Sequence, residues 1–202
     1  MASWPPPFTA EGRIVRVEPL TMDHRADLEA AAADGEPHRL WYTTVPAPED
    51  VGAEIERRRA LMAAGSMLPF AVIEMLSGRA VGMTTYMNID PAHRRVEIGS
   101  TWYRQSVQRT GLNTECKLLL LRHAFEELDC IAVEFRTHVM NRASRRAIER
   151  LGSKPDGVLR SHMIMPNGTI RDTAVYSIIA GEWPAVKANL ESLLEGPGSA
   201  PA

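Results

Sequence analysis

A turn rich in polar residues joins a strand-like run to an apolar helical run near the middle of this 202-residue chain. The turn, at residues 108–115, reads Gln-Arg-Thr-Gly-Leu-Asn-Thr-Glu and lies between the runs at 96–103 and 117–128. A glycine-containing turn that opens into a helix gathers unpaired backbone N–H groups at the positive end of the helix dipole. Such an arrangement binds phosphate groups, and Arg104 and Arg109 could add charge-assisted hydrogen bonds. The alternative is an ordinary surface turn with solvated arginines.

The strand-like run before this turn carries one carboxylate beside a glycine. Alternation along the strand places Val96 and Ile98 on one face and Glu97 and Gly99 on the other. A carboxylate in this position faces either solvent or a cleft. An ion pair with a neighbouring arginine would account for it without any chemistry, so the strand alone leaves the role of Glu97 open.

A second helix start carries two further polar residues. Asn141 precedes a helical stretch and is suited to cap it, a role that requires no ligand. Ser144 lies one turn into the helix, where a serine can also bond to its own backbone. Gly152 is expected to end this helix.

The elements that position these residues follow from hydrophobic spacing and from turn residues. Helical spacing and capping residues predict helices over residues 21–33, 49–64, 113–128, 141–151 and 182–194. In the second of these helices, Val51, Ile55 and Leu61 are expected on the buried side and the charged residues 54 and 56–59 mostly elsewhere. Alternating and continuous apolar runs predict strands over residues 13–18, 68–75, 80–89, 95–102, 131–139, 158–165 and 169–179.

The connections between these strands predict one mixed sheet. Turn residues at 90–93 and an Asn-Gly turn at 166–168 indicate hairpins, whose strands are antiparallel. The strands on either side of the helix at 113–128 are joined by a crossover, so they should be parallel. We therefore expect an α/β (α+β) domain at residues 12–194, with a mostly antiparallel seven-stranded sheet, helices on both faces and one central parallel pair. Residues 1–11 are expected to be a poorly ordered lead-in, and residues 195–202 a disordered tail.

Composition limits the partners. The net charge is −2, which argues against nucleic acid or an anionic membrane as a general partner. No run of 18 apolar residues and no segment of signal-peptide type occurs, so a cytoplasmic protein without a membrane span is expected. The two cysteines, Cys116 and Cys130, are expected to be free thiols. The six histidines show no metal-ligand spacing, so no metal is expected.

The motifs, taken in this order, resemble the GNAT acetyltransferase superfamily over about residues 12–190. The superfamily's phosphate loop has the pattern Q/R-x-x-G-x-G/A, which Gln108 and Gly111 match, while Asn113 stands where the pattern has Gly or Ala. Other features are similar to the RimJ/RimL branch of the superfamily: Glu97-Ile98-Gly99, Thr114-Glu115, Asn141-x-x-Ser144, Leu151-Gly152, Gly157-Val158-Leu159-Arg160 and Arg171-Asp172-Thr173 to Tyr176.

The resemblance implies an N-acetyltransferase that moves an acetyl group directly from acetyl-CoA to a primary amine in a ternary complex. In this reading Glu97 accepts the proton of the amine, directly or through water, and Ser144 assists the leaving thiolate. Many superfamily members use a tyrosine seven residues after the asparagine, but this chain has Ile148 there, which favours Ser144. The central parallel pair would be splayed around the donor. The residues implied to bind acetyl-CoA are Thr101 and Trp102, through a backbone oxyanion site, and Gln108, Arg109, Thr110, Gly111, Leu112, Asn113, Thr114 and Asn141.

The acceptor is the part that the sequence defines least. The resemblance favours a protein N-terminal α-amine, with a small-molecule amine as the alternative, and either a monomer or a homodimer. Two other functions remain open: a CoA-binding sensor or interaction module without turnover, and an enzyme that uses a longer donor such as succinyl-CoA. Residues expected to rim the acceptor cleft, each of which could equally serve packing or the surface, are Trp41, Tyr42, Tyr86, Asn88, His138, Arg160 and His162.

Overall fold

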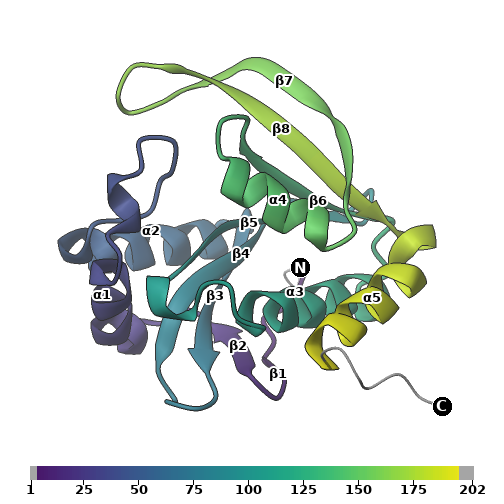
Figure 1. Ribbon diagram of the computed structural model, residues 1–202, viewed down its shortest axis with the longest axis horizontal. Coiled ribbons are helices and arrows are strands. Elements are labelled where there is room, and N and C mark those ends of the chain that lie inside the picture. Colours follow the sequence, from purple (N-terminus) through teal and green to yellow (C-terminus); the bar gives the residue numbers. More distant parts are fainter. Residues whose placement is uncertain (1–3, 196–202) are drawn as a thin grey trace.

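The computed structural model describes residues 4–195, and one mixed sheet forms the centre of this part of the chain (Figure 1). Its eight strands have the order β1-β2-β3-β4-β5-β6-β8-β7. Neighbouring strands are antiparallel except for β5 and β6, which are parallel, so the predicted mixed sheet with a central parallel pair is confirmed. The strands are β1 (Ala10–Glu11), β2 (Val15–Pro19), β3 (Met67–Glu74), β4 (Ala80–Asp90), β5 (Arg95–Tyr103), β6 (Ala132–His138), β7 (Lys154–Ile164) and β8 (Ile170–Ile179).

Helices cover both faces of the sheet. On one face, α1 and α2 pack over β3 and β4, with Leu28, Ile55 and Trp102 in their core. On the other face, α3, α4 and α5 enclose a larger core that includes Leu120, Leu151 and Leu190. Figure 1 shows the long β7–β8 hairpin extending beyond α4. The helices are α1 (Arg25–Ala33), α2 (Val51–Ala63), α3 (Leu112–Arg122), α4 (Arg142–Arg150) and α5 (Trp183–Glu195). A π-helical turn, His123–Glu127, extends α3.

The ends of the elements differ from the predictions in physically simple ways. The eighth strand, β1, has only two residues and pairs with β2. The lead-in that contains β1 also packs on the body, since the ring of Phe8 stacks on His123 with centroids 3.5 Å apart. Strand β7 begins at Lys154 rather than at residue 158. It is an edge strand, and a register shift between Pro155 and Gly157 accommodates a proline there. The predicted tail, except Glu195, lies outside the described residues, as do residues 1–3.

The α3 helix is tied to the start of the sheet by one buried carboxylate. Glu115 accepts backbone N–H hydrogen bonds from Arg13, Ile14 and Val15 at 3.0, 2.6 and 2.8 Å. The approach is so close that a Cβ on Gly12 would lie 2.5 Å from Cδ of Glu115. These bonds fix the beginning of α3, and therefore the turn before it, against β2.

No helix in the described part of the chain combines the length and the apolar character that crossing a membrane requires. Cys116 and Cys130 are both buried free thiols, as predicted.

Candidate active site

The two central strands separate shortly after they begin to pair. Strands β5 and β6 are in register only from Arg95 opposite Ala132 to Glu97 opposite Glu134. Beyond this point β5 continues along β4 as far as Tyr103, and β6 continues along β8 as far as His138. Within residues 4–195, each strand therefore has an edge without a partner strand over its second half. Extended, amide-bearing ligands pair with such edges.

Glu97 lies where this separation begins. Its side chain is on the α1–α2 face of the sheet, and the residue is only 5% exposed. Oε2 accepts a hydrogen bond of 2.6 Å from Nδ2 of Asn88 and lies 3.4 Å from Nε of Arg136. Burial raises the pKa of Glu97, while Arg136 and the bond from Asn88 oppose the rise. Glu97 is therefore a buried carboxyl group with a raised pKa at the point where the two strands separate.

Charged side chains of β6 and β8 lie near Glu97. Glu134 accepts hydrogen bonds from Arg136, at 2.8 Å, and from Arg95. Arg171 on β8 donates to the hydroxyl of Thr173 at 2.9 Å, and its charge acts on Glu97. The alternation of Glu134 and Arg136 on β6 was visible in the sequence. Alternation along one strand does not by itself indicate that these side chains surround Glu97.

The turn before α3 is held by its own side chains. Gln108 donates from Nε2 to the carbonyl of Tyr103 at 2.9 Å, and the hydroxyl of Thr110 donates to the carbonyl of Val107 at 2.7 Å. The left-handed residue is Arg109, with φ of 62°, whereas Gly111 has φ of −66°. Gly111 serves close packing instead, since a Cβ there would lie 3.0 Å from Ile14.

The start of α3 has the features of an anion site. Its first amides have no acceptor within the helix, although the N–H of Leu112 is bonded to Thr110 Oγ1 at 3.2 Å. Asn113 is half-buried at this end, and buried Thr114 accepts a 3.0 Å bond from Arg150 of α4. Arg104, which was expected to face phosphate, is instead paired with Asp34 at 2.8 Å.

The α4 helix begins as predicted. Oδ1 of Asn141 accepts the backbone N–H of Ser144 at 3.0 Å, which confirms the N-cap. The helix follows directly on β6, so Asn141 and half-buried Ser144 lie beyond the end of a strand that borders the gap.

Comparison with known proteins identifies the family of this fold. The family described as Acetyltransferase (GNAT) domain matches residues 15–154, more than half of the chain. The chain belongs to the GNAT acetyltransferase family. The GNAT resemblance that the motifs indicated is therefore confirmed.

The similar proteins include two N-acetyltransferases of Bacillus subtilis. YdaF of Bacillus subtilis (strain 168), named as a proposed ribosomal N-acetyltransferase, is 32% identical over 113 residues, 56% of this chain and 61% of YdaF. YoaA of the same organism, named as an N-acetyltransferase, is 31% identical over 99 residues, 49% of this chain and 55% of YoaA. The chain thus spans less than two thirds of the length of either relative.

Solved structures match over more of their length. A GCN5-related N-acetyltransferase from Brucella melitensis is 32% identical with a TM-score of 0.85, and the match covers 98% of this chain and 90% of that one. RimJ of Mycobacterium smegmatis, solved in complex with CoA-disulfide, is 23% identical with a TM-score of 0.78, over 95% and 96% of the two chains. The likeness to RimJ concerns the fold.

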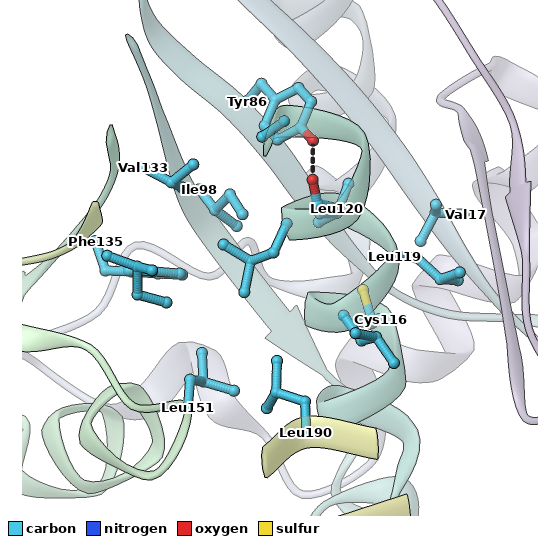
Figure 2. Close-up of a cluster of buried hydrophobic side chains, with 14 of the residues drawn as sticks. Val17, Tyr86, Ile98, Cys116, Leu119, Leu120, Val133, Phe135, Leu151 and Leu190 are labelled. Atoms are coloured by element: carbon cyan, nitrogen blue, oxygen red, sulfur yellow. Dashed lines mark hydrogen bonds between the residues drawn. The ribbon is translucent and has the colours of Figure 1, made fainter. Parts of the chain in front are cut away.

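Within this GNAT fold, one residue that was predicted to contact the acceptor lies in the core instead. Tyr86 is fully buried on the α3 face of the sheet, opposite to Glu97, and its hydroxyl donates to the carbonyl of Leu120 (Figure 2). It pairs with Ile98 across β4 and β5, so alternation puts both side chains in the core. The prediction that Tyr86 contacts substrate is therefore wrong.

The other acceptor residues have varied positions. Asn88 contacts Glu97 because its left-handed backbone, with φ of 46°, interrupts the alternation of β4. Trp41, 50% exposed in the loop between α1 and α2, places its ring edge-on to His138 and Tyr42, with centroids 5.2 and 5.5 Å away. This loop therefore reaches the end of β6. Arg160 is exposed on β7, two strands from β6.

Two buried cations beside the gap were not predicted. Arg58 of α2 was expected away from the buried side of its helix, yet it is 2% exposed and shares that side with Val51 and Ile55. Lys117 of α3 is 5% exposed and donates to the hydroxyls of Thr84 and Thr101 at 3.0 and 2.8 Å. Their spacing in the sequence indicates this burial, because each lies three or four residues from a buried apolar residue of its helix.

The titration of Lys117 gives a test of its burial. Burial lowers its pKa from 10.5 to about 8, so between these values the unfolded chain binds more protons than the folded one. Folding stability should therefore rise with pH across this window, by up to about 3 kcal/mol. Denaturant unfolding of the wild type and of Lys117→Met, from pH 7 to 10.5, gives the difference in their free energies of unfolding. Because Cys116 and Tyr103 titrate in both proteins, their contribution largely cancels in this difference. Parallel pH curves for the two proteins would contradict the prediction.

Proposed function

We propose that this GNAT family member transfers an acetyl group from acetyl-CoA to a primary amine within a ternary complex. The observation that carries the proposal is the place of Glu97, a buried carboxylate with a raised pKa at the point where β5 and β6 separate. A proton acceptor at a gap between strands suits attack by an amine on an acyl group held along the strand edge.

The donor is proposed to bind from the turn before α3 to the gap between the strands. The amides of residues 109–114 would hold its diphosphate, because they lie at the positive end of the helix dipole. The partnerless edge of β5 from Gly99 onward would pair with the amides of the pantetheine arm, and Asn141 would contact the same arm from the start of α4. Acetyl-CoA supplies the activated acyl group in this scheme.

The residues of the chain then move two protons. Glu97 takes a proton from the ammonium of the acceptor, directly or through one water, so that the nitrogen lone pair becomes free. A bond forms between that nitrogen and the acyl carbon, and the carbon–sulfur bond breaks. Ser144 would donate its hydroxyl proton to the departing thiolate and recover a proton from the water molecule that takes the second proton of the attacking nitrogen. A backbone N–H of Thr101 or Trp102 would stabilise the oxyanion in between.

The acceptor is proposed to be the α-amine at a protein N-terminus. The name of YdaF, which refers to ribosomal acetylation, supports a protein acceptor. The exposed Trp41 loop beside the end of β6 offers an aromatic surface for a peptide, and Glu97 offers a buried carboxylate to its amine.

Release of free thiol, followed with acetyl-CoA, a panel of N-terminal peptides and a panel of small amines, tests this function. Mass spectrometry should locate one added acetyl group on the α-amine of at least one peptide. Calorimetry should show binding of acetyl-CoA at micromolar protein. A folded protein that does not bind acetyl-CoA would defeat the proposal, and binding without turnover on any acceptor would favour a CoA-binding module. Succinyl-CoA, tested in parallel, distinguishes a longer donor.

A further inference from the structure

Strand β5 is interrupted by a bulge just after Glu97. Gly99 pairs with Thr85 and Trp102 with Met83, so two residues of β5, Ser100 and Thr101, face a single residue of β4. Ser100 has φ of 47°, a backbone conformation that a serine rarely adopts. A bulge redirects the N–H groups around it, and this one lies where β5 has already lost β6 as a neighbour. The direction of these amides therefore depends on whatever holds the bulge.

Arg58 holds the bulge from the α1–α2 face. It donates to the carbonyl of Ser100 at 3.2 Å and to the hydroxyl of Thr85 at 2.8 Å. Its charge is compensated by Glu54, whose Oε1 lies 2.6 Å from Nε of Arg58. The guanidinium thus links the carbonyl of the bulge to the strand opposite it.

Lys117 holds the bulge from the α3 face. Its ammonium bonds to the hydroxyl of Thr101 in the bulge and to that of Thr84, the residue on β4 that faces the bulge. Among residues 4–195 no carboxylate forms an ion pair with it. Its neighbours on α3 do not neutralise it either, because burial raises the pKa of the Cys116 thiol and Glu115 is bonded to three backbone amides.

Packing alone does not account for these two cations. A buried charge is costly, and apolar side chains of similar volume would stabilise the core at least as well. Both cations instead converge from opposite faces on one bulge, beside the carboxylate proposed as the base. Buried charges with perturbed pKa values concentrate at functional sites, and burial lowers the pKa of Lys117 to about 8.

We propose that Lys117 and Arg58 are positioning residues for acyl transfer, which hold the Ser100 bulge so that a backbone N–H of Thr101 or Trp102 faces the thioester carbonyl. The uncompensated charge of Lys117 strengthens this hydrogen bond as negative charge develops on the carbonyl oxygen. The inference rests on the proposed function, since it requires an acyl donor at the gap. Lys117 and Arg58 do not contact Glu97, and their proposed role acts through the backbone of the bulge.

Binding of acetyl-CoA and of CoA, measured by calorimetry, tests the inference without knowledge of the acceptor. CoA lacks the thioester carbonyl. Lys117→Met and Arg58→Met should therefore weaken the binding of acetyl-CoA about tenfold and leave the affinity for CoA within about twofold of wild type. The carbonyl ¹³C resonance of labelled acetyl-CoA should move downfield on binding to the wild type and much less on binding to the variants. Arg57→Met is the matched control, because Arg57 also bonds Glu54 but is exposed and does not reach the bulge.

The outcomes distinguish the positioning role of Lys117 and Arg58 from the proposed acetyl transfer. An equal loss of affinity for acetyl-CoA and CoA overturns the positioning role. So does a carbonyl resonance that moves as far downfield on binding to Lys117→Met as on binding to the wild type. Wild-type protein that binds neither ligand overturns the proposed function, and the positioning role with it. If Lys117→Met does not fold, Thr101→Val removes only the hydroxyl that Lys117 holds and must show the same selective loss. Thr101→Val with wild-type selectivity would then contradict the inference.

Discussion

Glu97→Gln is expected to slow acetyl transfer by about 10²–10⁴-fold while leaving acetyl-CoA binding almost unchanged. Glutamine preserves the volume of the side chain and can still accept the bond from Asn88, but it cannot take a proton from an ammonium. Steady-state kinetics with one acetylated amine, together with calorimetry of the donor, measures the two effects separately.

The pH profile gives the same test a second readout. The proposed mechanism requires Glu97 in its deprotonated form, and burial raises its pKa. The value of kcat/KM should therefore rise with pH over a range above that of an ordinary glutamate. This acidic limb should be absent from Glu97→Gln. Glu134→Gln is the matched control, because Glu134 pairs with Glu97 in register and has the same neighbour, Arg136. A wild-type rate in Glu97→Gln would remove Glu97 from the mechanism.

The second large effect concerns stability. Glu115→Ala is expected to lower the free energy of unfolding by about 3 kcal/mol or more, because the amides of Arg13, Ile14 and Val15 lose a charged acceptor at once. Denaturant unfolding at neutral pH measures the change. The loosened start of α3 should also weaken the binding of acetyl-CoA.

Glu127→Ala provides the comparison for this loss. Glu127 is an exposed carboxylate at the end of the same helical segment, 3.8 Å from His123. An exposed carboxylate in a contact this long contributes at most about 1 kcal/mol, so this variant should unfold almost like the wild type. If Glu115→Ala lost no more stability than Glu127→Ala, the carboxylate would not be the anchor of α3.

The parts of the fold that the sequence predicts well are those specified by local chemistry. The Asn141 cap and the Asn-Gly turn with Gly168 at φ of 79° each depend on a few adjacent residues. The parallel pair β5–β6 follows from one crossover, and the general base candidate follows from the alternation around Glu97. Local signals of this type survive folding because tertiary contacts agree with them.

The errors arise where backbone irregularity or helix rotation decides the outcome. Regular alternation puts Tyr86 and Asn88 on the same face, but the left-handed backbone of Asn88 brings only that residue to Glu97. Lys117 precedes Leu121 by four residues and so shares its buried face, although a charge suggests exposure. Arg58 follows Ile55 by three residues on α2 and likewise lies on the buried face of its helix. A charge at an apolar helical position was therefore the signal that sequence analysis missed.

The central claim is that the amides at the start of α3 bind the diphosphate of the acyl donor and so direct its acyl group into the gap between β5 and β6. A crystal structure of the protein with bound CoA tests this claim most directly. The account predicts the diphosphate against the backbone of residues 109–114 and the thiol beside Ser144, within reach of the Ser100 bulge. A diphosphate bound on another surface, with the strand gap unoccupied, would contradict it.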